Sequence, residues 1–163
     1  MRVICLDFDG VLNSVGSFIY NNRLKLQGLT DTPTHESFDP IACSNLQYIL
    51  EELPDVQIVV SSSWRKYKTL AALQEIFKQN NLLPDRMVGT TPELPSRYRG
   101  DEIEAYLKDH PEVTEFVIVD DDSDMKPYMD RLIKTDSRNG LTFTDAERVI
   151  ELFGGTNDEE KGQ

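Results

Sequence analysis

Three short apolar segments, each followed by a polar residue, constrain the fold of this chain more than any other feature of its sequence. They cover residues 2–6, 56–60 and 115–119. Their Val and Ile content is typical of strands buried on both faces, and the helical patterns between them imply right-handed crossovers into a parallel sheet. The residues that follow are Asp7, Ser61 and Asp120. We therefore expect these three side chains at the carboxyl edge of the sheet, where ligands bind in such folds.

Further strands and helices complete an α/β fold. The weaker strand candidates are residues 86–88 and 131–134, and the helical candidates are residues 40–53, 64–80, 101–109 and 144–153. Asp39 and Pro40 are a typical helix start, and Thr144 is expected to cap the last helix. The alternation predicts three layers, with a central parallel sheet of about five strands and helices on both of its faces.

The length of 163 residues predicts one domain, because domains average about 150 residues. We assign residues 1–155 to this domain and expect residues 156–163 to form a frayed tail. Residues 13–38 are polar, lack a clear apolar period and are too few for a folded cap domain. We therefore predict that they form a flap over the carboxyl edge of the sheet.

The charge balance restricts the partners of the protein. With 29 acidic and 17 basic side chains the formal net charge is −12, so the mean field repels anionic membranes and disfavours stable nonspecific binding to nucleic acid. The two cysteines, Cys5 and Cys43, favour neither a disulfide framework nor a Cys/His zinc site. No apolar run approaches the ~20 residues of a spanning helix. These features predict a cytoplasmic protein, and they leave its oligomeric state open.

Two carboxylates at the end of the first strand predict catalysis. Asp7 and Asp9 stand two residues apart, and Gly10 permits a tight turn behind them. One carboxylate can attack a phosphoryl group to give an aspartyl-phosphate, while the other gives a proton to the leaving oxygen and later takes one from the attacking water. A calcium loop of the EF-hand type is disfavoured, because its glycine and its twelfth-position Glu are missing when counted from Asp7.

An acidic run after the third strong strand brings more carboxylate to the same edge. It begins with Asp120 and Asp121 and reaches Asp124. Carboxylate oxygens are the ligands that a hard cation such as Mg2+ prefers. Such a cation would offset the repulsion between the clustered acids and an incoming phosphate.

Hydroxyl and basic side chains near two helix starts suit phosphate oxygens. Ser61 and Ser62 stand where a helix would offer free backbone N–H groups, although the same serines suit a helix N-cap. Arg97 and Arg99 precede another helix, and either would bring a positive charge to the phosphoryl group, with Arg99 our first choice and Lys126 a further candidate. In the same region we expect Trp64 to pack in the core or under the flap.

Together these motifs resemble those of the haloacid dehalogenase (HAD) superfamily of phosphohydrolases, whose fold is Rossmannoid. The segment Asp7-Phe-Asp-Gly-Val-Leu resembles the first motif of the superfamily, Ser61 the second and Asp120-Asp121 the fourth. Arg99 or Arg97 occupies the place of the third, where these proteins usually have Lys. The resemblance implies that Asp7 is the nucleophile, that Asp9 is the acid/base, and that Mg2+ is the cofactor. The implied Mg2+ ligands are Asp7, the backbone of Asp9, Asp120 and Asp121.

Three segments narrow the resemblance to the minimally capped branch with phosphatase domains in bacterial and phage RNA-repair (Swiss Army Knife) proteins. They are Ser61-Ser-Ser-Trp-Arg65, Arg99-Gly-Asp-Glu-Ile103 and Val119-Asp-Asp-Asp122. An open site implies a phosphorylated small molecule or macromolecule end as substrate: a nucleotide, a polynucleotide end or a phosphoprotein. The net charge argues against polynucleotides unless basic residues gather near the mouth of the site. Candidates for such a group are Arg23, Lys25, Arg65, Lys66 and Lys68.

Two other classes of function stay open. A phosphate-accepting receiver domain is also an α/β sheet with acids at its edge, but its acceptor Asp would follow the third strand, where this chain reads Met87-Val-Gly-Thr-Thr91. A phosphate-binding or regulatory module would keep the fold without turnover. The complete set of acids favours the enzyme over both.

Overall fold

A computed structural model describes residues 1–154, and the tail predicted for residues 156–163 lies outside this part of the chain. Its strands form one all-parallel sheet in the order β3-β2-β1-β4-β5, which confirms the predicted α/β class. The strands are β1 (Arg2–Leu6), β2 (Val56–Val60), β3 (Met87–Thr90), β4 (Glu115–Asp120) and β5 (Leu132–Lys134). The α-helices are α1 (Val15–Leu26), α2 (Pro40–Glu52), α3 (Leu70–Gln79), α4 (Arg99–Asp109) and α5 (Phe143–Leu152).

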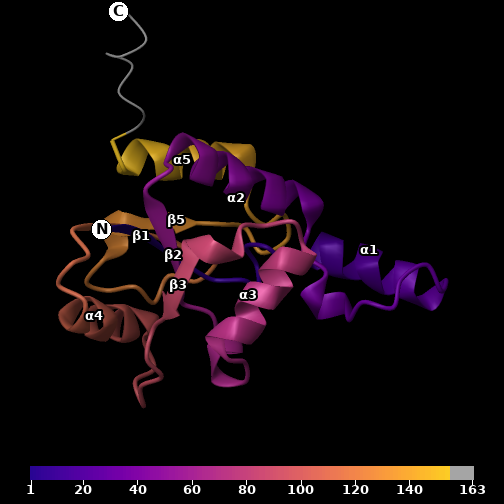
Figure 1. The fold of residues 1–163 in the computed structure, drawn as a ribbon, viewed down its shortest axis with the longest axis horizontal. Coiled ribbons are helices and arrows are strands. Elements are labelled where there is room, and N and C mark those ends of the chain that lie inside the picture. Colours follow the sequence, from indigo (N-terminus) through magenta and orange to yellow (C-terminus); the bar gives the residue numbers. More distant parts are fainter. Residues whose placement is uncertain (155–163) are drawn as a thin grey trace, which may run out of the picture.

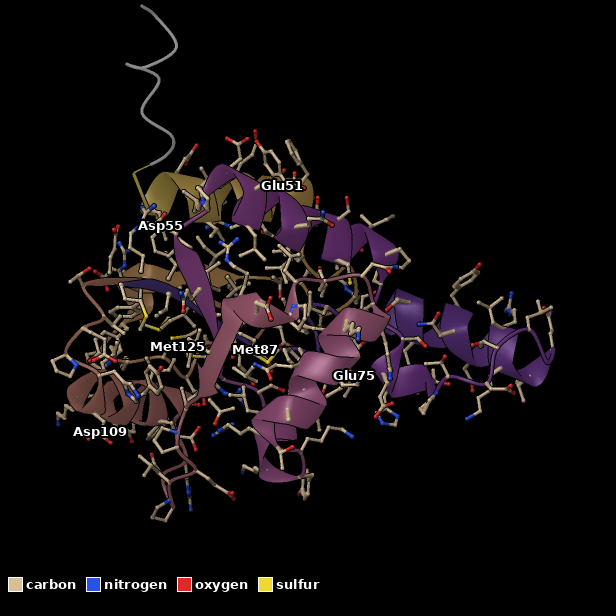
Figure 2. All side chains as sticks on the ribbon, viewed as in Figure 1. Glu51, Asp55, Glu75, Met87, Asp109 and Met125 are labelled. Atoms are coloured by element: carbon tan, nitrogen blue, oxygen red, sulfur yellow. The ribbon has the colours of Figure 1, made fainter. Side chains whose placement is uncertain are left out.

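The sheet is buried on both faces, which explains why its central strands are continuously apolar. On one face Ile4 and Leu6 of β1 join a core with side chains from α2, α3 and α5. On the other face Val3 and Cys5 pack against α4 (Figure 1). Figure 2 shows Met87 and Met125 inside the fold, where the first belongs to the α2/α3/α5 core and the second to the α4 core.

The helix starts agree with the prediction at α2 and differ from it at α3 and α5. Asp39 accepts a hydrogen bond from Ile41 N at 3.0 Å, as expected for α2. The helix predicted from residue 64 is instead divided into the 3-10 turn η2 (Ser63–Lys66) and α3, because Thr69 caps α3. Likewise Thr142, rather than Thr144, forms the capping box of α5.

Residues 13–38, predicted as a flap without a helical period, contain α1 and the 3-10 turn η1 (Thr34–Glu36). Local capping explains the helix, because Ser14 and Ser17 form a capping box at its start. Asn21 is the one buried residue of α1, and its side chain donates to Ser37 O at 2.6 Å. The helix extends away from the sheet, so an apolar stripe was not required for its formation (Figure 1).

Within residues 1–154, none of the helices combines the length and the apolar character that a membrane crossing requires.

Candidate active site

The three polar residues at the strand ends lie side by side, as the sequence predicts. Strand β1 is the centre of the sheet, and Leu6 pairs with Val60 of β2 and with Val119 of β4. Asp7, Ser61 and Asp120 each follow one of these paired residues, so they share one row across the sheet edge. The backbone pairing continues past the row, since Asp7 N donates to Val119 O at 3.0 Å and Ser61 N donates to Leu6 O at 2.8 Å.

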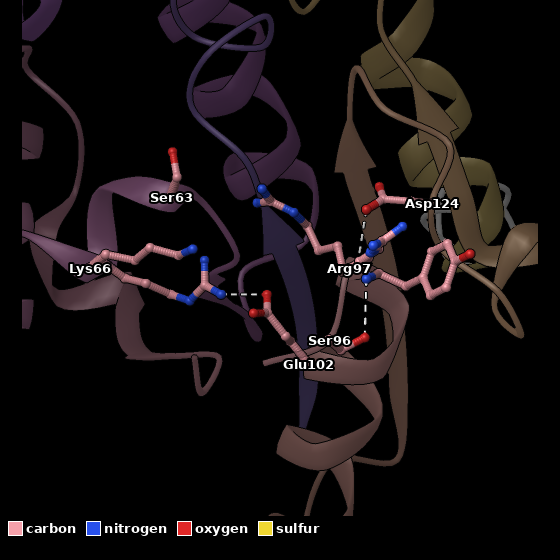
Figure 3. A pocket seen from close by; sticks show the side chains of 9 residues that line it. Ser63, Lys66, Ser96, Arg97, Glu102 and Asp124 are labelled. Carbon is pink, nitrogen blue, oxygen red and sulfur yellow. Dashed lines mark hydrogen bonds and ion pairs between the residues drawn. The ribbon is translucent and has the colours of Figure 1, made fainter. Parts of the chain in front are cut away.

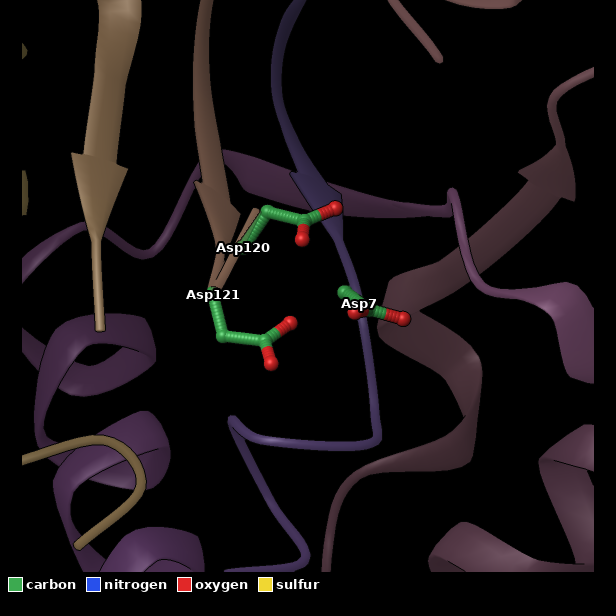
Figure 4. Close-up of side chains that lie close together, drawn as sticks. All are labelled: Asp7, Asp120 and Asp121. Carbon is green, nitrogen blue, oxygen red and sulfur yellow. The ribbon is translucent and has the colours of Figure 1, made fainter. Parts of the chain in front are cut away.

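An acid cluster, formed by Asp7, Asp120 and Asp121, occupies this edge. Each residue offers one carboxylate oxygen, and these oxygens lie within 4.8 Å of one another (Figure 4). Gly10 makes room for the third acid: its φ is +79°, and a Cβ there would collide with the Asp121 carboxylate. Asp9 has an exposed side chain outside the cluster.

Arg99 balances part of this negative charge. From the first residue of α4, its Nη1 lies 3.6 Å from Asp7 Oδ1 and its Nε lies 3.6 Å from Asp120 Oδ2. Burial lowers the pKa of a guanidinium, but the charges of Asp120 and Asp7 outweigh burial and raise the pKa of Arg99. The cation therefore stays charged beside the predicted nucleophile.

Burial changes the titration of two acids of the cluster, Asp7 and Asp120. It raises the pKa of Asp7 to about 6, while the charge of Arg99 and a hydrogen bond from Phe8 N act in the opposite direction. It raises the pKa of Asp120 to about 9, and the neighbouring Asp7 raises it further. Raised pKa values in clustered, buried acids are typical of a site that a cation would complete.

The unpartnered atoms of the site fit a phosphate and a hard cation. Among residues 1–154, four buried side-chain atoms have no hydrogen-bond partner: Ser61 Oγ, Arg99 Nη1, Asp120 Oδ2 and Asp124 Oδ1. The hydroxyl and the guanidinium can donate to phosphate oxygens, and the carboxylate oxygens can bind a cation. Because such atoms are costly to bury alone, their grouping at one edge indicates a ligand with both chemistries.

The other predicted site residues lie further from the acids. Ser62 is an N-cap, as its side chain accepts from Trp64 N at 3.3 Å. Arg97 and Lys126 are exposed, and each lines a pocket beside the site. Of the cations considered for the third motif, Arg99 is therefore the one that the fold brings against Asp7.

Arg65, one of the candidates for a basic group at the mouth of the site, has a buried side chain. Its guanidinium pairs with Glu102, donates to Thr91 O at 3.0 Å and donates to Ser62 O at 2.7 Å. These contacts tie η2 to α4 and to the chain after β3, so Arg65 stabilises the loops around the site. Nothing in the local sequence distinguishes this arginine from an exposed one.

Replacing Asp120 by Asn is expected to stabilise the metal-free protein at pH 8 by about 1–3 kcal/mol. The folded pKa of about 9 exceeds the ordinary value of 3.8. The contribution of Asp120 to the free energy of unfolding is therefore fully present below about pH 4 and is lost as the pH rises toward 9. Thermal unfolding should show a smaller difference in stability between Asp120→Asn and the wild type at pH 5 than at pH 8. Mg2+ should stabilise the wild type more than the variant.

The control for this experiment is Asp122→Asn, because Asp122 is exposed and outside the acid cluster. It should change neither the stability at pH 8 nor the response to Mg2+. Lower stability of Asp120→Asn at pH 8 would contradict the assignment of a buried, destabilising charge.

Comparison with known proteins adds a family match. The family model described as "HAD domain in Swiss Army Knife RNA repair proteins" matches residues 3–146, from β1 into the first turn of α5. Searches of curated proteins and of solved structures find no match. The matched range contains the whole acid cluster together with Ser61 and Arg99.

Proposed function

This chain belongs to the family of HAD domains in Swiss Army Knife RNA repair proteins and is a HAD-type hydrolase domain, and on that premise we propose that it is a Mg2+-dependent phosphomonoesterase. The observation that carries the proposal is the row of Asp7, Ser61 and Asp120 at one sheet edge, with Arg99 set against its acids. Asp7 would be the nucleophile, and the reaction would pass through an aspartyl-phosphate.

Each step of the proposed reaction is assigned to one side chain. Phe8 N donates to Asp7 Oδ1 at 2.9 Å, which fixes the carboxylate for attack on phosphorus. As the Asp7–phosphorus bond forms and the ester bond breaks, Asp9 gives a proton to the leaving oxygen. Asp9 then takes a proton from water, which attacks phosphorus and frees Asp7.

The phosphate oxygens would be held by Ser61 and Arg99, whose donors are free for them. Asp7, Asp120 and Asp121 are the residues that would hold Mg2+, together with the backbone of Asp9. When bound, Mg2+ supplies Lewis-acid charge that offsets the repulsion between these acids and the phosphate.

Phosphate release from p-nitrophenyl phosphate tests this proposal. We expect turnover with Mg2+ and its loss when a chelator removes the metal. A protein that is stabilised by Mg2+ yet releases no phosphate from any substrate would favour the second candidate, a phosphate-binding module without turnover. We place the activity in the cytoplasm, which suits the two buried, free cysteines.

We propose that the substrate carries a second phosphate, as nucleotides and polynucleotide ends do. A pocket of about 120 Å³ opens beside Arg99, and Lys66 and Arg97 line it from two different segments (Figure 3). In a protein of net charge −12, these cations form a local site for an anion. Lys66 Nζ lies 3.7 Å from an exposed Glu93 carboxylate, a pair that water screens.

Replacing both Lys66 and Arg97 by Ala is expected to lower kcat/KM for a nucleoside 3′,5′-bisphosphate about 10-fold more than for p-nitrophenyl phosphate, since each charged contact contributes about 0.5–1 kcal/mol at an exposed site. A phosphorylated dinucleotide and a phosphopeptide complete the substrate panel. Lys108→Ala, an exposed substitution at the other end of α4, is the control. Equal losses on all substrates, or a preference for the phosphopeptide, would point to the phosphoprotein phosphatase instead.

A further inference from the structure

We propose that Trp64 is the positioning residue for Asp9, and this inference rests on the proposed function, in which Asp9 is the acid/base. Trp64 Nε1 donates a hydrogen bond to Asp9 Oδ2 at 3.0 Å. The two residues come from different loops, one after β1 and one after β2. The bond joins an exposed carboxylate to an indole that is only 8% exposed.

The indole is a rigid donor because packing fixes it from several sides. Its ring lies 5.3 Å from the Phe8 ring and 5.8 Å from the Phe38 ring, measured between centroids. Its backbone belongs to η2, which Ser62 caps and Arg65 ties to α4. The donor therefore holds one place relative to the loop that carries Asp9.

Asp9, in contrast, has an exposed side chain, and its carboxylate would otherwise rotate between rotamers. An indole N–H can only donate, so it engages Oδ2 and leaves Oδ1 as the oxygen that exchanges a proton with the substrate. Restricting the carboxylate to one orientation lowers the entropy lost on reaching the transition state. The bond thus acts on the proton transfer and not on phosphate binding.

The flap, residues 13–38, contacts the same indole through His35 as well as through Phe38. The His35 ring lies 5.8 Å from the Trp64 ring, and Asn13 Nδ2 donates to His35 O at 2.8 Å. Lys68 Nζ lies 3.0 Å from Glu36 Oε1, which ties the flap to the chain after η2. These contacts keep the indole covered and turned toward Asp9.

Trp64→Phe tests the proposal, because it keeps an aromatic ring and removes the N–H. Departure of an alkoxide needs the proton from Asp9, whereas p-nitrophenolate departs without full protonation. We expect kcat/KM to fall about 10-fold for an alkyl phosphate and less than about 3-fold for p-nitrophenyl phosphate, given the strength of a hydrogen bond to a charged group. Equal losses on both substrates would overturn the positioning role.

Phe38→Leu is the matched control for packing. The buried Phe38 ring packs against the indole, but a phenyl ring has no N–H with which to hold Asp9. It should lower the melting temperature and leave the ratio of the two kcat/KM values at the wild-type level. A changed ratio in this variant would assign the effect to packing and overturn the proposal.

A second measurement needs neither turnover nor a change at Trp64. Trp64 is the single tryptophan of the chain, so tryptophan fluorescence reports on the surroundings of this one indole, which include Asp9. Asp9→Ala and Asp9→Asn should change the emission spectrum, and Asp122→Asn should not. An unchanged spectrum in both Asp9 variants would overturn the inference, whereas absence of turnover in the wild type, with the spectral change present, would overturn the proposed function and leave the contact established.

Discussion

Asp7→Asn is expected to lower phosphate release at least about 10³-fold, because an amide cannot form the aspartyl-phosphate. The variant should fold, since Asn is isosteric and its amide oxygen can still accept from Phe8 N. Asp7 is buried with a raised pKa, so removal of its charge does not cost stability at neutral pH. The measurement is phosphate release from p-nitrophenyl phosphate at saturating Mg2+.

The control for this variant is again Asp122→Asn, which removes one carboxylate from the same loop region without touching the acid cluster. It should retain wild-type turnover. Acid quenching of the wild type during turnover should trap a phosphorylated protein, and the Asp7→Asn variant should give none. Wild-type turnover by Asp7→Asn would contradict the assignment of Asp7 as the nucleophile, even if the metal dependence were confirmed.

Asp9→Asn is expected to lower kcat/KM for alkyl phosphates by about 10² to 10⁴, the range for loss of a general acid. The loss should be smaller for p-nitrophenyl phosphate, whose leaving group needs little help. Asn also cannot take the proton from the attacking water. The phosphorylated protein should therefore accumulate, and rapid mixing should show a burst of p-nitrophenolate followed by slow turnover.

The exposure of Asp9 simplifies this experiment, because within residues 1–154 the hydrogen bond from Trp64 is the one that its side chain makes. Thermal unfolding should match the wild type within about 0.5 kcal/mol. If both substrates lost activity equally and no burst appeared, Asp9 would be acting on phosphate binding and not on proton transfer.

The sequence alone determined the sheet and the place of the reaction. Strands such as β1 and β2 are buried on both faces, so they must be apolar throughout, and the pattern ends where the strand meets solvent. Parallel strands all end at one edge, which brings Asp7, Ser61 and Asp120 together whatever the details of the loops. The burial of a strand is visible in its own run of apolar residues, and this is why the sheet and its edge could be predicted from the sequence.

Only the tertiary structure decided which polar side chains meet. Arg97 and Arg99 have the same charge and nearly the same place in the sequence, yet the start of α4 turns Arg99 toward Asp7 and leaves Arg97 in the neighbouring pocket. The pair of Arg65 with Glu102 and the hydrogen bond from Trp64 to Asp9 likewise join segments that lie more than 30 residues apart in the sequence. Long polar side chains find their partners through the packing of distant segments, so no local pattern specifies these contacts.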